Sequence, residues 1–194
     1  MIHLRRFLKR LWVPVVLHVW PLARLWYRAW GLSLEGRPGD RVWYFAYGAN
    51  LNESVFRGRR RMRPLEVRVG RLPGYRLRFN LHGRPRGRSA PANIESSPGD
   101  EVWGVLNLMT RRDMVRLNAT EGVPGWRYRP VWLEANDTEG RIVQAFSLMA
   151  DGLPEDGNPS PRYITLIRDG ARQHGLPAHW LERLDRVRAA EERE

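Results

Sequence analysis

The 194-residue chain contains no cysteine, which excludes a disulfide framework, a Cys-based metal site and a thiol nucleophile. The absence also fits a reducing compartment, so we expect a cytoplasmic protein. Lysine is nearly absent, because Lys9 is the only one and the other 32 of the 33 basic residues are arginine. The longest apolar run, residues 11–23, is shorter than the roughly 20 residues that cross a bilayer. Arginines follow it where a secretory signal has its small-residue cleavage site, so neither a spanning helix nor such a signal is expected.

Two common catalytic centres are missing as well. None of the five histidines pairs in an HxxxH or HExxH spacing, so no metal site is expected. No GxSxG motif marks a serine nucleophile. Any catalytic group must therefore be sought among the 21 carboxylates, most of which lie between other charges or in loops and are expected to be solvated.

The length suits one compact domain, and its periodic part begins near Arg41. Apolar runs predict strands at 42–47, 75–81, 102–109, 130–135 and 141–149, with a weaker one near 65–70. Residues 135–140 are typical of a hairpin loop. Capping patterns predict helices at 111–118, from 160 to about 174, and from 177 onward. We therefore expect an α+β domain in which a closed or strongly curved sheet carries its helices outside.

Positive charge is concentrated between Arg57 and Arg88, where the sequence contains twelve arginines and only one acid, Glu66. Such a stripe is able to bind phosphates. It lacks interleaved aromatic residues and any nucleic-acid-binding motif, so no nucleic acid partner is expected. A solvated surface, or a surface facing anionic lipid, is the interpretation we favour.

Residues 1–40 differ in composition from the rest and form a basic, Trp-rich arm ending in the linker 33–40. Apolar residues at 4, 7, 8 and 11 predict a short amphipathic helix with basic residues on its other face. Tryptophans flanked by arginine across residues 1–30 are typical of a segment in a membrane interface. Packing on its own domain or on a second subunit, as in a homodimer, stays open as the alternative.

The stretch "YFAYGANL" (44–51) ends a buried strand abruptly on a glycine and an asparagine. A sharp turn beside a strand exposes several backbone N–H groups at one place. Such a turn is either a corner in the chain or a cradle for an anionic or carbonyl-bearing ligand. From these residues alone both interpretations stay open.

The tripeptide Thr-Glu-Gly occurs twice, around Glu121 and Glu139. Glu139 lies in a polar hairpin, where we expect a solvated carboxylate. Glu121 follows a predicted helix and precedes a loop stiffened by glycine and proline that leads to Trp126 and Tyr128. A glutamate held on a stiff turn among apolar residues is a candidate general base, with a solvated carboxylate as the alternative.

Four blocks in order resemble the γ-glutamylcyclotransferase family. "YFAYGANL" is similar to its YFAYGSNL signature and "SSPGDEVWGVLNLM" (96–109) to its SPGDEVWGV strand. "LNATEG" (117–122) resembles its LDxxEG, and "PSPRYITLIRDGARQHGLP" (159–177) its PSPxY helix segment. The resemblance implies a small mixed β-barrel with flanking helices over 41–190. The arm 1–40 has no counterpart in the family.

The resemblance also implies a reaction and a site. The family cyclises a γ-glutamyl amino acid or amine to 5-oxoproline, needs no cofactor or metal, and uses the glutamate of LDxxEG, here Glu121, as general acid/base. Substrate-binding positions carried over are Tyr44, Phe45, Ala46, Tyr47, Gly48, Ala49, Asn50, Leu51, Tyr128 and Tyr163. Ala49 and Asn118 depart from the family's Ser and Asp. The rival hypothesis is a non-catalytic relative that binds a small ligand and attaches to a membrane or partner through its arm.

Overall fold

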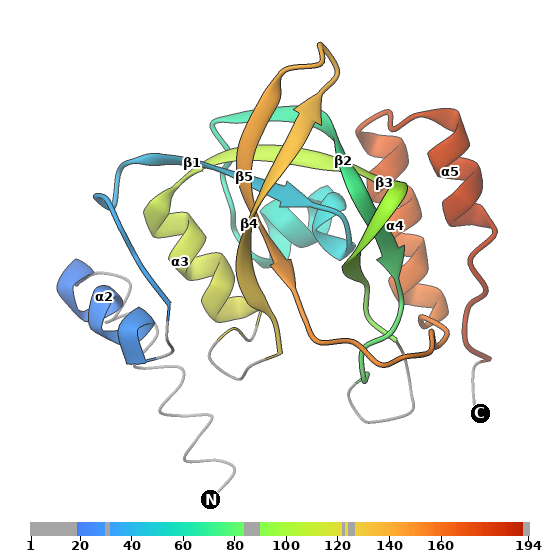
Figure 1. Cartoon of the computed structure of the whole chain (residues 1–194), viewed down its shortest axis with the longest axis horizontal. Helices are drawn as coiled ribbons and strands as arrows, with labels where there is room; N and C mark the ends of the chain where they lie inside the picture. Colours follow the sequence, from blue (N-terminus) through green and yellow to red (C-terminus); the bar gives the residue numbers. More distant parts are fainter. Residues whose placement is uncertain (1–18, 30–31, 84–89, 122, 124–126, 192–194) are drawn as a thin grey trace, which may run out of the picture.

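Five strands form one closed barrel in the computed structural model, which describes residues 19–29, 32–83, 90–121, 123 and 127–191 (Figure 1). The strands are β1 (Arg41–Ala46), β2 (Glu66–Arg78), β3 (Asn93–Thr110), β4 (Arg129–Asp137) and β5 (Ile142–Met149). The helices are α2 (Trp20–Ala29), α3 (Arg111–Thr120), α4 (Pro161–Gln173) and α5 (Ala178–Asp185). A 3-10 turn (Ala49–Leu51) and a π-helical turn (Ser54–Arg59) lie between β1 and β2.

The barrel closes through a parallel pair of strands. Its order is β1-β3-β2-β4-β5, and β5 returns to β1 with Trp43 opposite Ala145 and Tyr44 opposite Phe146. The other neighbouring strands are antiparallel. With α4 and α5 on one side of the barrel and α3 on the other, the predicted mixed barrel with flanking helices is confirmed (Figure 1). β1 is buried on both of its faces along most of its length, which explains its nearly continuous apolar sequence.

The strands predicted at 65–70 and 75–81 are one strand, so this detail of the prediction was wrong. β2 pairs with β3 from Glu66 to Arg78, and its register shifts between Pro73 and Tyr75. Pro73 has no N–H to donate and Gly74 has a φ of 75°, so the sequence resembles a turn. Because β3 runs alongside both halves, the two residues produce an irregularity in the ladder and the strand continues.

The predicted helix starts are confirmed and help to place the turn after β1. Thr110 Oγ1 caps α3 by accepting from the Asp113 N–H, and Ser160 Oγ caps α4 by accepting from the Tyr163 N–H. Gly170 of α4 lies against the 49–52 turn, where a Cβ would come within 2.5 Å of the Asn52 nitrogen. A larger residue would push the helix off the turn, so this glycine fixes their separation.

The arm is described only from residue 19, and the helix predicted around residues 4–11 lies outside the described part. Within α2, Ala23 and Tyr27 are buried in the same core as the barrel. The fully buried Asn118 donates through Nδ2 to Tyr27 Oη at 2.6 Å. An ionised aspartate would carry the cost of a fully buried charge at this position, which the neutral asparagine avoids. The domain boundary at residue 40 stays a prediction. No helix among the described residues has the length and apolarity needed to cross a bilayer.

Tyr27→Phe should lower the free energy of unfolding by about 1–3 kcal/mol, because the buried Asn118 Nδ2 loses its acceptor. Urea denaturation measures the difference. Tyr75→Phe is the matched control, since the Tyr75 hydroxyl has no hydrogen bond to a described residue. Equal stability losses in the two variants would show that the contact between α2 and α3 contributes nothing specific.

Candidate active site

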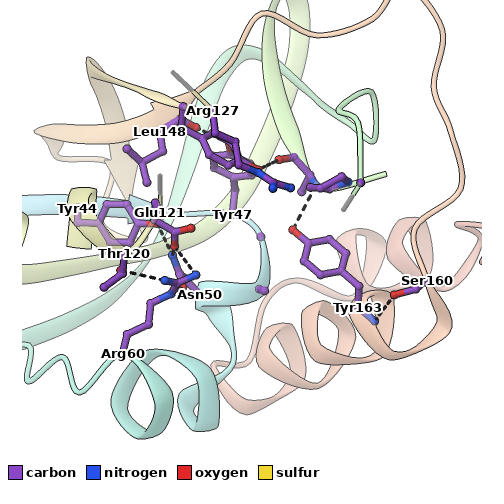
Figure 2. Close-up of a pocket in the computed structure, with 16 residues that line it drawn as sticks. Tyr44, Tyr47, Asn50, Arg60, Thr120, Glu121, Arg127, Leu148, Ser160 and Tyr163 are labelled. Atoms are coloured by element: carbon purple, nitrogen blue, oxygen red, sulfur yellow. Dashed lines mark hydrogen bonds and ion pairs between the residues drawn. The ribbon is translucent and has the colours of Figure 1, made fainter. Parts of the chain in front are cut away.

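A cavity of about 530 Å³ opens where β1 and β5 end. Segments far apart in the sequence supply its walls: the turn after β1, the end of α3, the start of β4 and the first turn of α4 (Figure 2). Of the predicted site residues, the structure brings together Tyr44, Tyr47, Gly48, Ala49, Asn50, Glu121, Tyr128 and Tyr163. The turn in "YFAYGANL" is therefore part of a concave site.

Glu121 is the C-cap residue of α3, and its backbone N–H donates to the Leu117 carbonyl. The carboxylate is 14% exposed and lies at the negative end of a helix dipole, a position that disfavours a negative charge. Two neighbouring side chains compensate the negative charge of the carboxylate. Arg60 Nη2 lies 2.8 Å and Asn50 Nδ2 2.7 Å from the same oxygen, Oε1 (Figure 2). Within the described part of the chain, Oε2 has no hydrogen-bond partner and stays available to a ligand.

Arg60 uses all three of its guanidinium nitrogens to connect the residues on this side of the cavity. Nε donates to Asn50 Oδ1 at 2.7 Å, Nη1 to Thr120 Oγ1 at 2.9 Å, and Nη2 pairs with Glu121. The fork thus connects the turn after β1 to the end of α3. Its planar geometry sets the directions of its partners, which a lysine ammonium would not do.

Asn50 is held from both ends of its amide. Its Oδ1 accepts from Arg60, which assigns the NH2 end to Tyr44 Oη, at 2.9 Å, and to Glu121. Tyr44 is buried and stacks on Phe56. The Asn50 side chain therefore orients the carboxylate, while its backbone belongs to the turn.

Four tyrosines line the cavity, and all have pKa values raised by burial. Tyr47 Oη donates to the Leu148 carbonyl, and Tyr128 Oη donates to the Ala92 carbonyl at 2.9 Å. Tyr163 Oη accepts from the Ala92 N–H at 3.2 Å. They stay neutral over the physiological range, so they contribute hydrogen bonds and shape to the cavity, and no charge.

Three predicted residues do not line the cavity: Phe45, Ala46 and Leu51 are buried in the core. Neighbouring residues of a strand point to opposite faces, so a continuous stretch of sequence cannot face one ligand. The Leu51 N–H is also engaged, because it donates to the Gly48 carbonyl within the 3-10 turn. Only some residues of the motif therefore face the cavity.

Arg60, Thr120 and Arg127 line the cavity and were missed from the sequence. Arg60 is one of several arginines between 57 and 63, and nothing in the sequence distinguishes it from its neighbours. Arg127 directly precedes Tyr128, which is the only signal that pointed to it. Gly122 and Trp126, in the loop after Glu121, lie outside the described residues.

The second Thr-Glu-Gly behaves as expected. Glu139 is 67% exposed in the hairpin between β4 and β5 and pairs with Arg141 at 2.8 Å. No cluster of three or more metal-binding side chains occurs among the residues that the structure describes.

A γ-glutamylcyclotransferase of Bos taurus is 32% identical over 162 residues, covering 80% of this chain and 83% of the relative. The Mus musculus γ-glutamylcyclotransferase is 33% identical over 156 residues, covering 78% and 81%. The chain belongs to the γ-glutamylcyclotransferase family. The AIG2-like family also matches residues 101–184.

Solved structures agree with this assignment. A γ-glutamyl cyclotransferase structure superimposes with a TM-score of 0.70 and 29% identity, covering 79% of this chain and 91% of that one. An uncharacterized protein from Homo sapiens gives the same TM-score at 28% identity, covering 79% and 92%. Because the relatives named for cyclotransferase activity match most of the chain, the chain is a γ-glutamylcyclotransferase.

Arg60→Met should lower kcat on a γ-glutamyl substrate by roughly 10- to 100-fold, the worth of one or two charge-assisted hydrogen bonds. The substitution leaves Glu121 without its cation and Asn50 without its donor. Arg59→Met removes an exposed arginine next in sequence and serves as the control. A wild-type kcat in Arg60→Met, with the fold intact by circular dichroism, would contradict the role of the fork.

Proposed function

We propose that this family member cyclises the γ-glutamyl group of a γ-glutamyl amino acid or amine to 5-oxoproline, with Glu121 as general acid/base. The observation that carries the proposal is the state of the Glu121 carboxylate. One oxygen is fixed by Arg60 and Asn50, the other has no partner among the described residues, and Glu121 lines the cavity. A positioned carboxylate with one free oxygen is what a proton shuttle requires.

The substrate brings its own nucleophile, its α-amino nitrogen. Glu121 takes one proton from the ammonium, and the nitrogen then attacks the γ-carbonyl carbon to close a five-membered ring. The C–N bond to the leaving group breaks as Glu121 gives its proton to the leaving nitrogen. One of the two remaining ammonium protons stays on the lactam, and the other ends on the released amine. The atoms balance without a protein nucleophile, cofactor or metal.

Most of the rate advantage comes from holding amine and carbonyl in attack geometry, worth about 7–11 kcal/mol in well-oriented systems. Proton transfer by Glu121 adds roughly 10²- to 10⁴-fold. In this proposal the turn Tyr47–Asn50 binds the γ-glutamyl group and steadies the developing oxyanion. Tyr128 and Tyr163 offer hydroxyl oxygens that accept substrate hydrogen bonds.

The residue at position 49 reduces the number of hydrogen-bonding groups that the turn offers to a substrate. Ala49 lines the cavity where the family signature has serine, so a hydroxyl contact is lost while the backbone remains. The missing hydroxyl is the observation that supports the rival function, a non-catalytic relative that binds a small ligand. The intact contacts around Glu121 favour the enzyme.

Glu121→Gln should remove most turnover, at least about 100-fold in kcat, because glutamine is nearly isosteric and cannot accept the proton. Formation of 5-oxoproline from γ-glutamyl-alanine measures it. Glu139→Gln, in the other Thr-Glu-Gly, is the matched control and should be close to silent. Full activity of Glu121→Gln, or a dead Glu139→Gln, would refute the assignment.

The proposal also includes a location: a cytoplasmic enzyme whose residues 1–30 contact the anionic inner face of a membrane. It is supported by the basic residues and tryptophans of this segment. Tyr27 and Ala23 are buried against the domain, so these two residues of the segment are not available to a lipid. A homodimer through the arm is the alternative.

Deletion of residues 1–18 should leave cyclotransferase kcat within about twofold and abolish sedimentation with phosphatidylserine-containing vesicles. Binding of the full chain should fall as salt is raised, because charged contacts with the lipid are screened. Vesicles of phosphatidylcholine alone are the control. A truncation that halves the molar mass in light scattering without changing vesicle binding would favour the homodimer.

A further inference from the structure

Arg127 is a second cation in the cavity, and the proposed reaction gives it no task. It is half-buried two residues before β4 begins and lines the cavity together with Tyr128 and Tyr163. Its charge lowers the pKa values of both phenols against the larger effect of burial, so the guanidinium lies near their hydroxyls. In Figure 2, Arg60 and Asn50 reach Glu121 from one side and Arg127 lies on the other.

The guanidinium of Arg127 has no hydrogen bond or ion pair to any residue that the structure describes. The segments outside the description hold only two acids, Glu192 and Glu194. Partial burial of a cation is costly unless an anion or several acceptors compensate it. Arg60, by contrast, is fully engaged with Glu121, Asn50 and Thr120. Among the described residues of the cavity, Arg127 is therefore the positive charge that has no partner.

The proposed function leaves two substrate classes open, γ-glutamyl amino acids and γ-glutamyl amines. Only one of them carries a charge that matches the unpaired cation Arg127. Among the described residues that line the cavity, Arg60, Arg127 and Glu121 are the charged ones, and their charges sum to +1. The γ-glutamyl group brings one ammonium and one carboxylate, so it is neutral overall. A leaving amino acid adds one further carboxylate and neutralises the site, whereas a leaving amine leaves Arg127 unpaired.

We propose that Arg127 binds the carboxylate of the leaving amino acid and so selects γ-glutamyl amino acids over γ-glutamyl amines. This inference rests on the proposed function, in which the Tyr47–Asn50 turn and Glu121 hold the γ-glutamyl group. The carboxylate of that group is bonded to the same carbon as the amine at Glu121 and stays beside the turn. The leaving group extends beyond the γ-carbonyl, which leaves the Arg127 side of the cavity to its carboxylate. Arg127 presents a fork suited to bidentate carboxylate binding.

The test compares two ligands that differ by one carboxylate, γ-glutamyl-alanine and γ-glutamyl-ethylamide. Calorimetric titration into Glu121→Gln protein keeps both ligands intact. In that background Arg127→Met should weaken the binding of γ-glutamyl-alanine about 10- to 100-fold. It should weaken the binding of γ-glutamyl-ethylamide less than about threefold. Arg127→Lys, which keeps the charge without the fork, should fall between. Arg129→Met is the control, because Arg129 is exposed and does not line the cavity.

Each other outcome overturns the inference. Equal weakening of both ligands would place Arg127 on the γ-glutamyl group, and no weakening would show that it touches neither. Failure of both ligands to bind when Arg127 is present would show that the cavity takes neither class. The proposed function is read separately, from 5-oxoproline formed by the wild-type enzyme, so its failure is distinguishable from the failure of the Arg127 assignment.

Discussion

The site depends on one side chain, Arg60, whose guanidinium joins three segments that the sequence keeps apart. It pairs with Glu121 at the end of α3, bonds Thr120 beside it, and holds Asn50 in the turn after β1. Without this cation, a carboxylate at a helix C-terminus and mostly shielded from water would be unfavourable. The fork therefore makes a carboxylate at this position compatible with the fold, and among the described residues the second carboxylate oxygen has no partner.

The barrel supplies the rigidity that this arrangement needs. Parallel pairing of β5 with β1 brings Leu148 to the Tyr47 hydroxyl, and close packing of α4 at Gly170 holds the 49–52 turn from behind. Tyr128 and Tyr163 both hydrogen-bond the backbone of Ala92, which ties the far wall to the start of β3. Because these contacts fix the walls to the barrel and to one another, the site is preorganised before any ligand enters.

Much of the fold was predictable from local signals. Caps at Thr110 and Ser160 marked two helices, and alternating apolar runs marked the strands of a curved sheet. The division of β2 into two strands was wrong because Pro73 and Gly74 resemble a turn locally, and only pairing with β3 shows that the strand continues. Glu121 was separable from Glu139 as a candidate by the glycines and proline that follow it in sequence and by its match to the LDxxEG motif. Arg60 and Arg127 were not distinguishable, since an arginine-rich chain carries no local sign of which cations face a cavity.

The sequence by itself determined the class of protein, because four ordered motifs point to the γ-glutamylcyclotransferase family. Only the tertiary structure decided which residues of the "YFAYGANL" stretch face the cavity, because Phe45 and Ala46 are buried in the core while Tyr44 and Tyr47 line the cavity. It also decided which arginine neutralises Glu121 and which one has no partner among the described residues. Electrostatic pairing depends on distances of a few ångströms between segments remote in sequence, and closure of the barrel sets those distances.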